Sequence, residues 1–380
     1  MIPRWVQLGL WILAAVVVWQ LLRGGLADRE RQARSRFKET VERTFPEQAA
    51  AARQRYGLVR LHEAEPGRAH IVLIHGLDDP GKVWMNLGPA LHAAGYGVSV
   101  MTYPNDQSVV DSAALFQESL RALSDDGVAR IAIVAHSMGG LVSREMLTNP
   151  ALACDAPDCQ IPAVARLIMI GTPNHGSSLA RFRGLGELRE QFARILAGQA
   201  GWLDWVFDGA GEAGIDITPG SSFLMALNAR PNPPETDLHV IAGVIAEEQA
   251  QAIDSLIADS APGDAGLQLV PLAERLGDGL VSLESATLED VPLYRVQGNH
   301  LSIIRNLDAA SDRTPPAIPI VLDLLADGDR PAGRIESPSR VSFNQSRSLA
   351  VFQLGLKPHA HHLPSRNSLK GLAEGWKVAN

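Results

Sequence analysis

The chain has 380 residues, of which 46% are hydrophobic and 20% are charged, so it is long enough for one large α/β domain with additions. Its net charge of -8 argues against a general affinity for nucleic acid, and no histidine stands near its two cysteines to complete a zinc site. A small-molecule or lipid substrate fits this composition better.

The first element is an uncharged apolar stretch of 18 residues, from 5 to 22. As a helix rising about 1.5 Å per residue, it would cover about 27 Å of a hydrocarbon layer that is about 30 Å thick. Trp5 and Trp19 lie near its ends, where indole rings prefer the membrane interface. We therefore expect residues 1–27 to form a single-pass transmembrane anchor. A cleaved signal peptide is the alternative, because the small residues up to Ala27 loosely resemble a cleavage site.

The charges and the cysteines give opposite indications of how this anchor is oriented. Basic residues follow it from Arg23 to Lys38, and the positive-inside tendency would place that side in the cytoplasm. A disulfide between Cys154 and Cys159 would instead place that side outside the cytoplasm, because such bonds persist in oxidising compartments. Two reduced thiols are the alternative, and they would not argue against the cytoplasm. The side of the membrane on which the main domain lies therefore stays open.

Beyond the anchor, the pattern changes from polar to alternating. Residues 28–60 are rich in Arg, Glu, Gln and Ala and predict a polar stalk helix. From 61 to 326, short β-branched runs alternate with amphipathic stretches, which is typical of one α/β domain with a mostly parallel sheet and helices on both faces. In chain order, we expect a strand at 70–74, a helix at 83–94, a strand at 96–103, a helix at 108–123 and strands at 129–135, 165–170 and 238–244.

Two segments of this chain do not fit the alternation. The long insertion at about 176–235 contains several large apolar side chains, and a loop of that length needs a purpose. We expect a helical cap over a substrate pocket; a satellite core that packs only on itself is the alternative. The tail at 327–380 has many Pro, Ser and Arg residues without a sustained periodicity, so we expect it to be loosely ordered.

The strongest chemical signal is the serine that follows the strand at 129–135. A tight turn between a strand and a helix lifts Ser137 out of the sheet, provided that the residues two positions away, Ala135 and Gly139, are small. The same turn places the backbone N–H of Met138 at a helix start, where partial positive charge favours an oxyanion. We predict that Ser137 is a nucleophile; a serine that only caps the helix is the alternative.

A second donor for the oxyanion is expected after the strand at 70–74. Gly76 lets the chain turn back towards the serine, so that the N–H of Leu77 can supply this donor. His75 is expected to shape the loop and not to transfer protons. His136, next to the serine, is expected to point away from it into the fold.

A serine nucleophile needs a base, and an imidazole held by a carboxylate supplies it, in the chain order serine, acid, histidine. Asp278 lies in a turn between two glycines, and His300 follows the alternating run at 291–296. Both positions suit loops at the carboxyl ends of strands, where catalytic groups gather. The competitors for the acid are Asp254, Asp264 and Asp290, none of which has glycines on both sides. The competitors for the base are His239, which lies inside an expected strand, and the histidines of the tail, which lie beyond the domain: His359, His361 and His362.

Six stretches occur in order between residues 71 and 302: VLIHGL, AHSMGG, IGTPNHGS, PGSSFLMALN, GDGLVS and GNHLS. In these stretches the chain resembles bacterial lipases of the α/β-hydrolase superfamily, including the deacylase-like branch related to proteins that remove acyl chains from inositol on glycolipid anchors. The resemblance implies an α/β-hydrolase fold, the triad Ser137, Asp278 and His300, oxyanion donors at Leu77 and Met138, and a strand that closes at Gly171-Thr172-Pro173. Because the similar lipases are bacterial, it also implies that the expected anchor lies in a bacterial inner membrane.

Some relatives carry a structural calcium site near the catalytic acid, but no matching set of carboxylates can be identified in this sequence. We therefore expect no cofactor and no metal. The expected function is hydrolysis of carboxylic esters through an acyl-enzyme, with lipid or long-acyl esters favoured by the anchor and the cap. Acyl transfer or thioester cleavage by the same triad is the alternative among enzymes, and a non-catalytic membrane scaffold is the alternative of another class. Protein partners cannot be predicted from the sequence.

Overall fold

The chain is described from a computed structural model. The structure describes residues 36, 39–77, 81–104, 107–152, 160–177, 212–246, 277–308 and 311–328. The predicted anchor, both cysteines, the middle of the predicted cap and most of the tail lie outside these residues.

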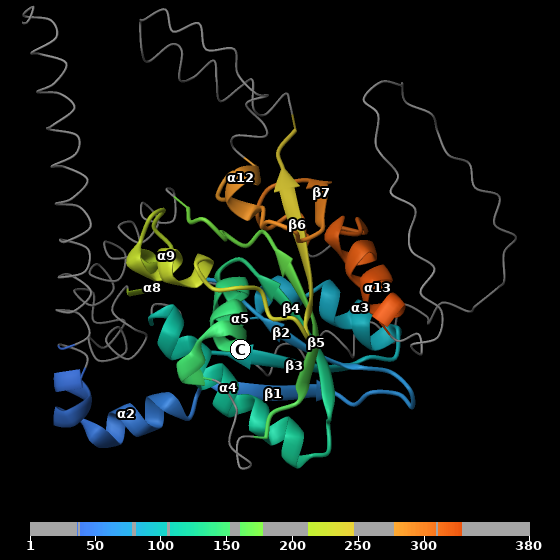
Figure 1. Cartoon of the computed structure of the whole chain (residues 1–380). Helices are drawn as coiled ribbons and strands as arrows, with labels where there is room; N and C mark the ends of the chain where they lie inside the picture. Colours follow the sequence, from blue (N-terminus) through green and yellow to red (C-terminus); the bar gives the residue numbers. More distant parts are fainter. Residues whose placement is uncertain are drawn as a thin grey trace, which may run out of the picture.

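Seven strands form one sheet in the order β1-β3-β2-β4-β5-β6-β7 (Figure 1). Only β1 runs antiparallel to its neighbour β3, and the other neighbouring strands are parallel. The predicted mostly parallel sheet is confirmed, and the chain has an α/β-hydrolase fold. The strands are β1 (Gly57–His62), β2 (His70–Ile74), β3 (Gly97–Thr102), β4 (Arg130–His136), β5 (Ala163–Ile170), β6 (Asp237–Val244) and β7 (Leu293–Gln297).

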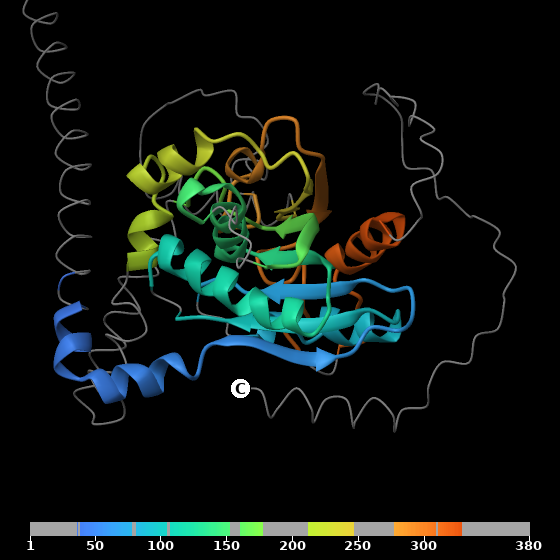
Figure 2. The same ribbon diagram turned by 60° about the horizontal axis from the view of Figure 1, so that its bottom comes forward.

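Helices cover both faces of this sheet (Figures 1 and 2). Along β2, Ile71 and Leu73 belong to the hydrophobic cluster with α3 and α13, whereas Val72 and Ile74 belong to the cluster with α4 and α5. Burial on both faces explains why the central strands are continuous apolar runs. The helices are α2 (Pro46–Arg53), η1 (Lys82–Trp84), α3 (Leu87–Ala93), α4 (Val109–Asp125), α5 (Met138–Thr148), η2 (Pro150–Leu152), α8 (Glu212–Asp216), α9 (Ser222–Asn228), α12 (Leu283–Ala286) and α13 (Ala317–Gly328).

The predicted end of the stalk helix was wrong, because the first strand begins before residue 60. A helix was expected up to residue 60, but α2 ends at Arg53 and residues 57–60 belong to β1. The chain changes direction at Gly57, whose φ of 132° suits glycine and not a helix. The edge strand then pairs with β3, a partner far along the sequence that stalk composition could not indicate.

Two predicted elements, the anchor and the cap, lie wholly or partly outside the described residues. Within the described ranges, no helix is long and apolar enough to cross a membrane, and the predicted anchor at 5–22 lies outside them. Of the predicted cap, α8 and α9 are described. They are attached to the core, since the Asp216 carboxylate accepts the amide of Val109 at 2.9 Å and α9 buries Phe223 and Leu227. The helical cap over a pocket stays a prediction.

Candidate active site

Ser137 lies between the end of β4 and the first residue of α5, as predicted. Its backbone has φ 54° and ψ -127°, a conformation that residues other than glycine rarely adopt and that costs about 1–3 kcal/mol. Its amide donates to the carbonyl oxygen of Ile170 at 2.9 Å, which fixes the turn against the end of β5. The serine is therefore held above the carboxyl ends of the strands in a strained turn.

Small residues make this turn possible. A Cβ atom on Gly139 would overlap the carbonyl oxygen of Ile74, and one on Gly140 would overlap the side chain of Thr172. A Cβ atom on Gly76 would lie 2.5 Å from Cβ of Ser137. The ends of β2, β4 and β5 can meet around the serine only because these positions lack side chains.

The predicted acid and base are in direct contact. Nδ1 of His300 donates to Oδ2 of Asp278 at 2.7 Å, and the backbone amide of His300 donates to the Asp278 carbonyl oxygen at 2.9 Å. The other carboxylate oxygen accepts the amides of Leu280 at 2.9 Å and Val281 at 2.8 Å. Both side chains are buried. With the hydrogen on Nδ1, the imidazole presents Nε2 as its proton acceptor.

Glycines also make space for this pair. Asp278 lies between Gly277 and Gly279, whose φ angles are 57° and 89°. A Cβ atom on Gly243, in β6, would lie 2.7 Å from Cβ of Asp278, and one on Gly171 would lie 3.1 Å from the Asp278 carboxylate. The glycines beside the acid were part of the prediction, whereas the role of Gly243 has no local sequence signal.

The ring of His300 lies against two residues that adjoin the serine, Gly171 and His136. Ser137 bonds to Ile170, the next residue is Gly171, and the missing Cβ of Gly171 would lie 3.2 Å from the ring of His300. His136, directly before the serine, has its ring centroid 4.7 Å from that of His300. The structure therefore brings the three predicted triad residues to the carboxyl ends of the parallel strands, which we call the carboxyl edge of the sheet; the opposite ends of these strands form its amino edge.

His136 contributes a contact that sequence reasoning missed. It points into the fold as expected, but its Nε2 donates to the backbone oxygen of His300 at 3.0 Å. Burial, followed by the nearby His300, lowers the pKa of His136 well below its ordinary value, so that the ring is neutral at physiological pH. A neutral imidazole can therefore hold the loop that carries the base.

The two predicted oxyanion donors belong to segments that adjoin the serine. Met138 is the first residue of α5, and the first amides of a helix have no acceptor within it. Leu77 follows Gly76, which lies against Ser137, and is half-buried. Met138 thus adjoins the serine along the chain, and Leu77 follows a residue that packs against it.

The family of the chain follows from a comparison with known proteins. Residues 71–265 match the model of a family described as a domain of unknown function (DUF7379). The chain belongs to this family. The matched range includes Ser137 and ends before Asp278 and His300. No curated protein matches the chain.

Three solved structures similar to this DUF7379 chain are named as ester-cleaving enzymes. The mature lipase BlEst2 from Bacillus licheniformis is 20% identical, with 70% of this chain and 97% of that chain covered and a TM-score of 0.47. The metagenomic carboxyl esterase MGS0156 is 17% identical, with 70% and 76% covered and a TM-score of 0.46. Phospholipase PlaB from Legionella pneumophila is 19% identical, with 68% and 59% covered and a TM-score of 0.43.

The competing candidates in this DUF7379 chain lie elsewhere. Asp290 precedes β7, at the opposite edge of the sheet, and His239 bonds through Nε2 to Asp237 at 3.0 Å near the start of β6. Asp254 and Asp264 lie outside the described residues.

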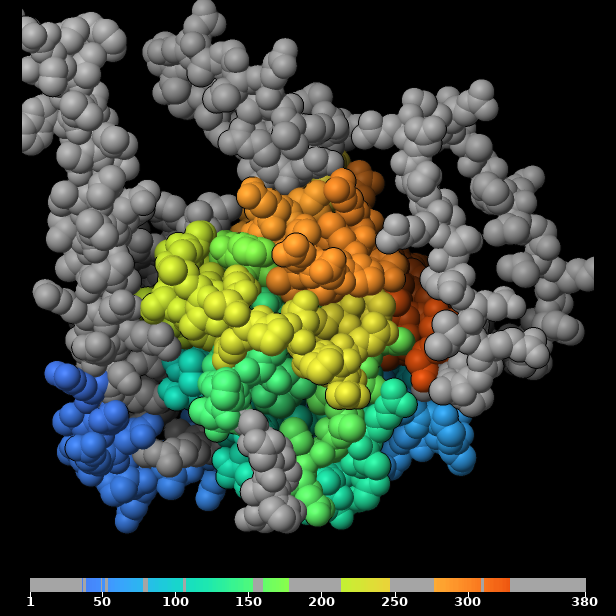
Figure 3. Space-filling model, viewed as in Figure 1, coloured from blue at the N-terminus to red at the C-terminus, as the bar shows by residue number. Residues whose placement is uncertain are grey.

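A buried polar network connects the helix after the serine to the described part of the cap. Arg144 of α5 donates to Oδ1 of Asn174 at 3.1 Å, and Asn174 donates to the carbonyl oxygen of Ala286 in α12 at 2.8 Å. Asn228 of α9 donates to the carbonyl oxygen of Asn174 at 2.9 Å. In Figure 3 the orange surface of α12 and β7 adjoins the yellow-green surface of α8 and α9. These contacts fix α9 and α12 beside the site.

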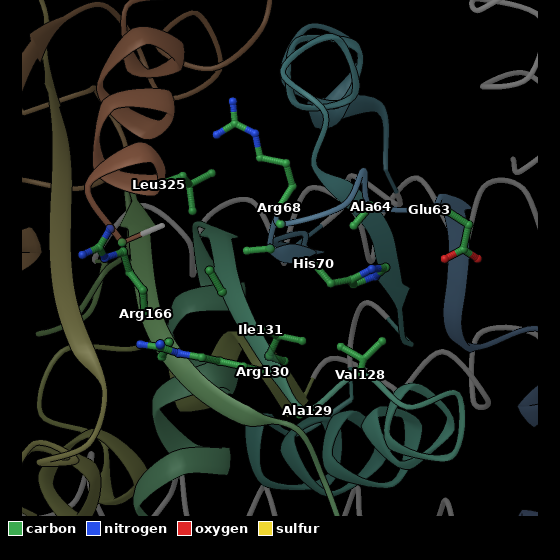
Figure 4. A pocket seen from close by; sticks show the side chains of 15 residues that line it. Glu63, Ala64, Arg68, His70, Val128, Ala129, Arg130, Ile131, Arg166 and Leu325 are labelled. Carbon is green, nitrogen blue, oxygen red and sulfur yellow. The ribbon is translucent and has the colours of Figure 1, made fainter. Parts of the chain in front are cut away.

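A cavity of about 550 Å³ lies at the amino ends of the strands, opposite the ends that carry Ser137 (Figure 4). Its lining includes Arg68, Arg130 and Arg166 near the starts of β2, β4 and β5. The guanidinium of Arg166 is bonded to the Asp237 carboxylate, at 3.0 Å and 2.7 Å. Because the predicted nucleophile, acid and base lie at the carboxyl edge, we assign the chemistry there and not to this cavity.

Proposed function

We propose that the chain is a carboxylic ester hydrolase in which Ser137, His300 and Asp278 act as a catalytic triad. The observation that carries this proposal is the buried Asp278–His300 hydrogen bond of 2.7 Å at the same sheet edge as a serine with φ 54°. A carboxylate that orients an imidazole beside a serine on a strained turn is the arrangement that serine hydrolases use.

The chemistry proceeds in two halves. Nε2 of His300 takes the proton of Ser137 while the serine oxygen attacks the ester carbonyl, and the amides of Leu77 and Met138 bind the resulting oxyanion. The tetrahedral intermediate expels the alcohol, which receives the proton from His300. Water then attacks the acyl-enzyme while His300 takes its proton. The second tetrahedral intermediate breaks its bond to the Ser137 oxygen, which receives the proton from His300, and the carboxylic acid leaves. Asp278 stays ionised throughout and stabilises the imidazolium.

For the substrate, we propose lipid or long-acyl esters. The support comes from the predicted anchor at 5–22 and from the apolar residues of the predicted cap, two features that would place an apolar substrate near the serine. A thioester or an acyl acceptor other than water would use the same acyl-enzyme. Comparing products from esters and thioesters, with and without an added alcohol, distinguishes these reactions.

The first test is labelling of the full chain by a serine-reactive fluorophosphonate, together with turnover of short and long p-nitrophenyl esters. We expect the wild type to label, and Ser137→Ala and His300→Ala to lose labelling and about 10⁴- to 10⁶-fold of kcat. Ser143→Ala, at a buried serine of α5 that bonds the Gly139 carbonyl, and His239→Asn are the matched controls and should keep both. A folded wild-type chain that neither labels nor turns over esters contradicts the proposal and favours the scaffold.

We also propose that residues 5–22 attach the chain to a membrane as a single-pass helix. Full-length protein should remain with the membranes after extraction at alkaline pH, whereas a variant that begins at residue 28 should be released. If the full-length chain is released as readily as the shortened one, the anchor proposal is wrong. If the full-length chain remains with the membranes, labelling of Cys154 and Cys159 by an impermeant thiol reagent reports the side of the membrane on which the main domain lies.

A further inference from the structure

The histidine before the predicted oxyanion loop makes a specific contact with that loop. His75 is completely buried, and its Nδ1 lies 2.7 Å from the carbonyl oxygen of Gly76. Because a carbonyl oxygen only accepts hydrogen bonds, Nδ1 carries the hydrogen and donates. Burial lowers the pKa of His75 to about 4, so that the ring is neutral at pH 7. Its Nε2 has no hydrogen-bond partner among the described residues, so the ring makes one directed contact.

Tyr103 holds this histidine in place. The two rings are stacked, with centroids 4.4 Å apart and planes inclined by 10°. The tyrosine hydroxyl also donates to the backbone oxygen of His75 at 2.6 Å. Both residues are buried, and burial raises the pKa of Tyr103, so its hydroxyl remains a donor. The ring face and the backbone of His75 are therefore both fixed.

The contact with the Gly76 carbonyl determines the direction of the next amide. In a planar trans peptide, the carbonyl oxygen of Gly76 and the amide hydrogen of Leu77 point to opposite sides. A carbonyl turned towards His75 leaves the Leu77 N–H on the side away from the buried ring. Gly76 itself packs on the serine, since its missing Cβ would lie 3.1 Å from Oγ of Ser137.

The alternative orientation of this peptide would be harmful. Rotation by about half a turn would direct the Gly76 carbonyl oxygen towards the space that the oxyanion occupies, and two negative oxygens would repel each other. Glycine tolerates many backbone conformations, so Gly76 by itself offers little resistance to the rotation. Something outside the loop has to select the orientation with the amide towards the reaction centre.

We propose that His75 is a positioning residue that locks the Gly76–Leu77 peptide with the Leu77 amide directed towards the oxyanion. The proposal rests on the proposed ester hydrolysis at Ser137 and deepens it, because it assigns the formation of the oxyanion hole to one side chain. Tyr103 supports the lock and does not contact the substrate.

Three substitutions of His75 distinguish the effect of its hydrogen bond from the effect of filling the space that its ring occupies. In His75→Asn, the amide nitrogen stands about where Nδ1 stands and can still donate to the Gly76 oxygen. In His75→Gln, the amide lies about where Nε2 stands, away from that oxygen, and His75→Leu has no donor. We expect His75→Asn to keep kcat within about threefold of the wild type, and the other two to lose about 100-fold, as for loss of one oxyanion donor. KM should change little.

The decisive measurement is the ratio of kcat/KM for an ester to that for the matched thionoester, whose sulfur is a weaker acceptor of the oxyanion hydrogen bonds. This ratio does not depend on the fraction of folded enzyme, so a loss of stability cannot imitate the effect. We expect the ratio to fall about tenfold or more in His75→Gln and His75→Leu and to stay near the wild-type value in His75→Asn.

The outcomes are distinct. If the wild type hydrolyses esters and the ratio in His75→Gln and His75→Leu equals that of the wild type, the lock is overturned while the triad stands. If His75→Asn loses as much as His75→Leu, the role of Nδ1 is overturned. If the wild-type chain is folded and hydrolyses nothing, the proposed function fails first.

Discussion

Two sets of glycines at opposite ends of the strands serve different purposes. At the amino edge, Gly67 and Gly127 have φ angles of 82° and 81°, and nothing lies within 4 Å of the Cβ that either residue lacks. At the carboxyl edge, Gly76, Gly140 and Gly171 lie against the serine, Thr172 and the Asp278–His300 pair. The first two satisfy the geometry of a turn, whereas the other three allow chemical groups to approach one another.

Two carboxylate–histidine pairs, one at each end of the parallel strands, differ in burial and in hydrogen bonding. Asp278 accepts three hydrogen bonds from the backbone and His300, and it is almost completely buried. Asp237 at the amino edge also bonds a histidine, His239, but half of its side chain is exposed. A carboxylate paired with a histidine therefore occurs at both edges, and only one of the pairs lies beside a serine.

Among variants that keep Ser137 and His300, the largest effect should come from Asp278→Asn, with the same exchange at Asp237 as the comparison. In Asp278→Asn, the amide oxygen can keep the bonds to Leu280 and Val281, while the amide nitrogen faces Nδ1 of His300 and favours the wrong tautomer. We expect kcat to fall about 10³- to 10⁴-fold with little change in KM. Asp237→Asn is the matched control and should leave kcat unchanged. Equal activity in both variants would remove Asp278 from the triad.

The glycines give the next effect. Gly171→Ala forces a left-handed conformation, at a cost of about 1–2 kcal/mol, and crowds the Asp278–His300 pair. We expect kcat to fall about 10- to 100-fold, because a small displacement of the base disturbs the reaction geometry. Gly127→Ala has the same backbone cost without the crowding, so unfolding measurements should detect it and ester turnover should not. A similar kcat in the two variants would mean that Gly171 serves the turn alone.

The sequence predicted the parts of this arrangement that have local patterns. The strand-turn-helix at Ser137, the glycines around Asp278 and most strands and helices could be read from adjacent residues. The strand β1 and the space at Gly243 could not, since each depends on a partner distant in sequence. The contact between His136 and His300 joins residues separated by 164 positions, so no local pattern encodes it.

That contact gives a smaller effect with a clear direction. At His136 the bonding atom is Nε2, whereas at His75 it is Nδ1, so the two histidines should respond oppositely to the same substitutions. Nδ1 of His136 has no hydrogen-bond partner in the described part of the chain. We expect His136→Gln to keep kcat within about threefold, and His136→Asn to lose about tenfold because the loop carrying His300 loses its donor. Rescue by Asn and not by Gln would refute this assignment.

The smallest effect is expected for the pH dependence of stability, from His70, a buried histidine at the amino ends of the strands. His70 bonds Ser99 at 2.8 Å, and burial, followed by the charge of Arg60, lowers its pKa to about 4. Between pH 4 and 6.5 the unfolded chain therefore binds a proton that the folded chain does not. The contribution of His70 to the free energy of unfolding is complete above pH 6.5 and declines as the pH falls towards 4.

His70→Gln tests this difference between the edges without touching the triad. Glutamine cannot titrate and can still donate to the Ser99 hydroxyl, so the slope of unfolding free energy against pH should decrease by at most about 1.4 kcal/mol per pH unit in that window. Denaturant unfolding at pH 5 and pH 7.5 measures the slope, and ester turnover at pH 7.5 should equal that of the wild type. An unchanged slope would mean that His70 has the same pKa in the folded and the unfolded chain. A loss of turnover would show that the amino ends of the strands are coupled to the chemistry at the carboxyl ends.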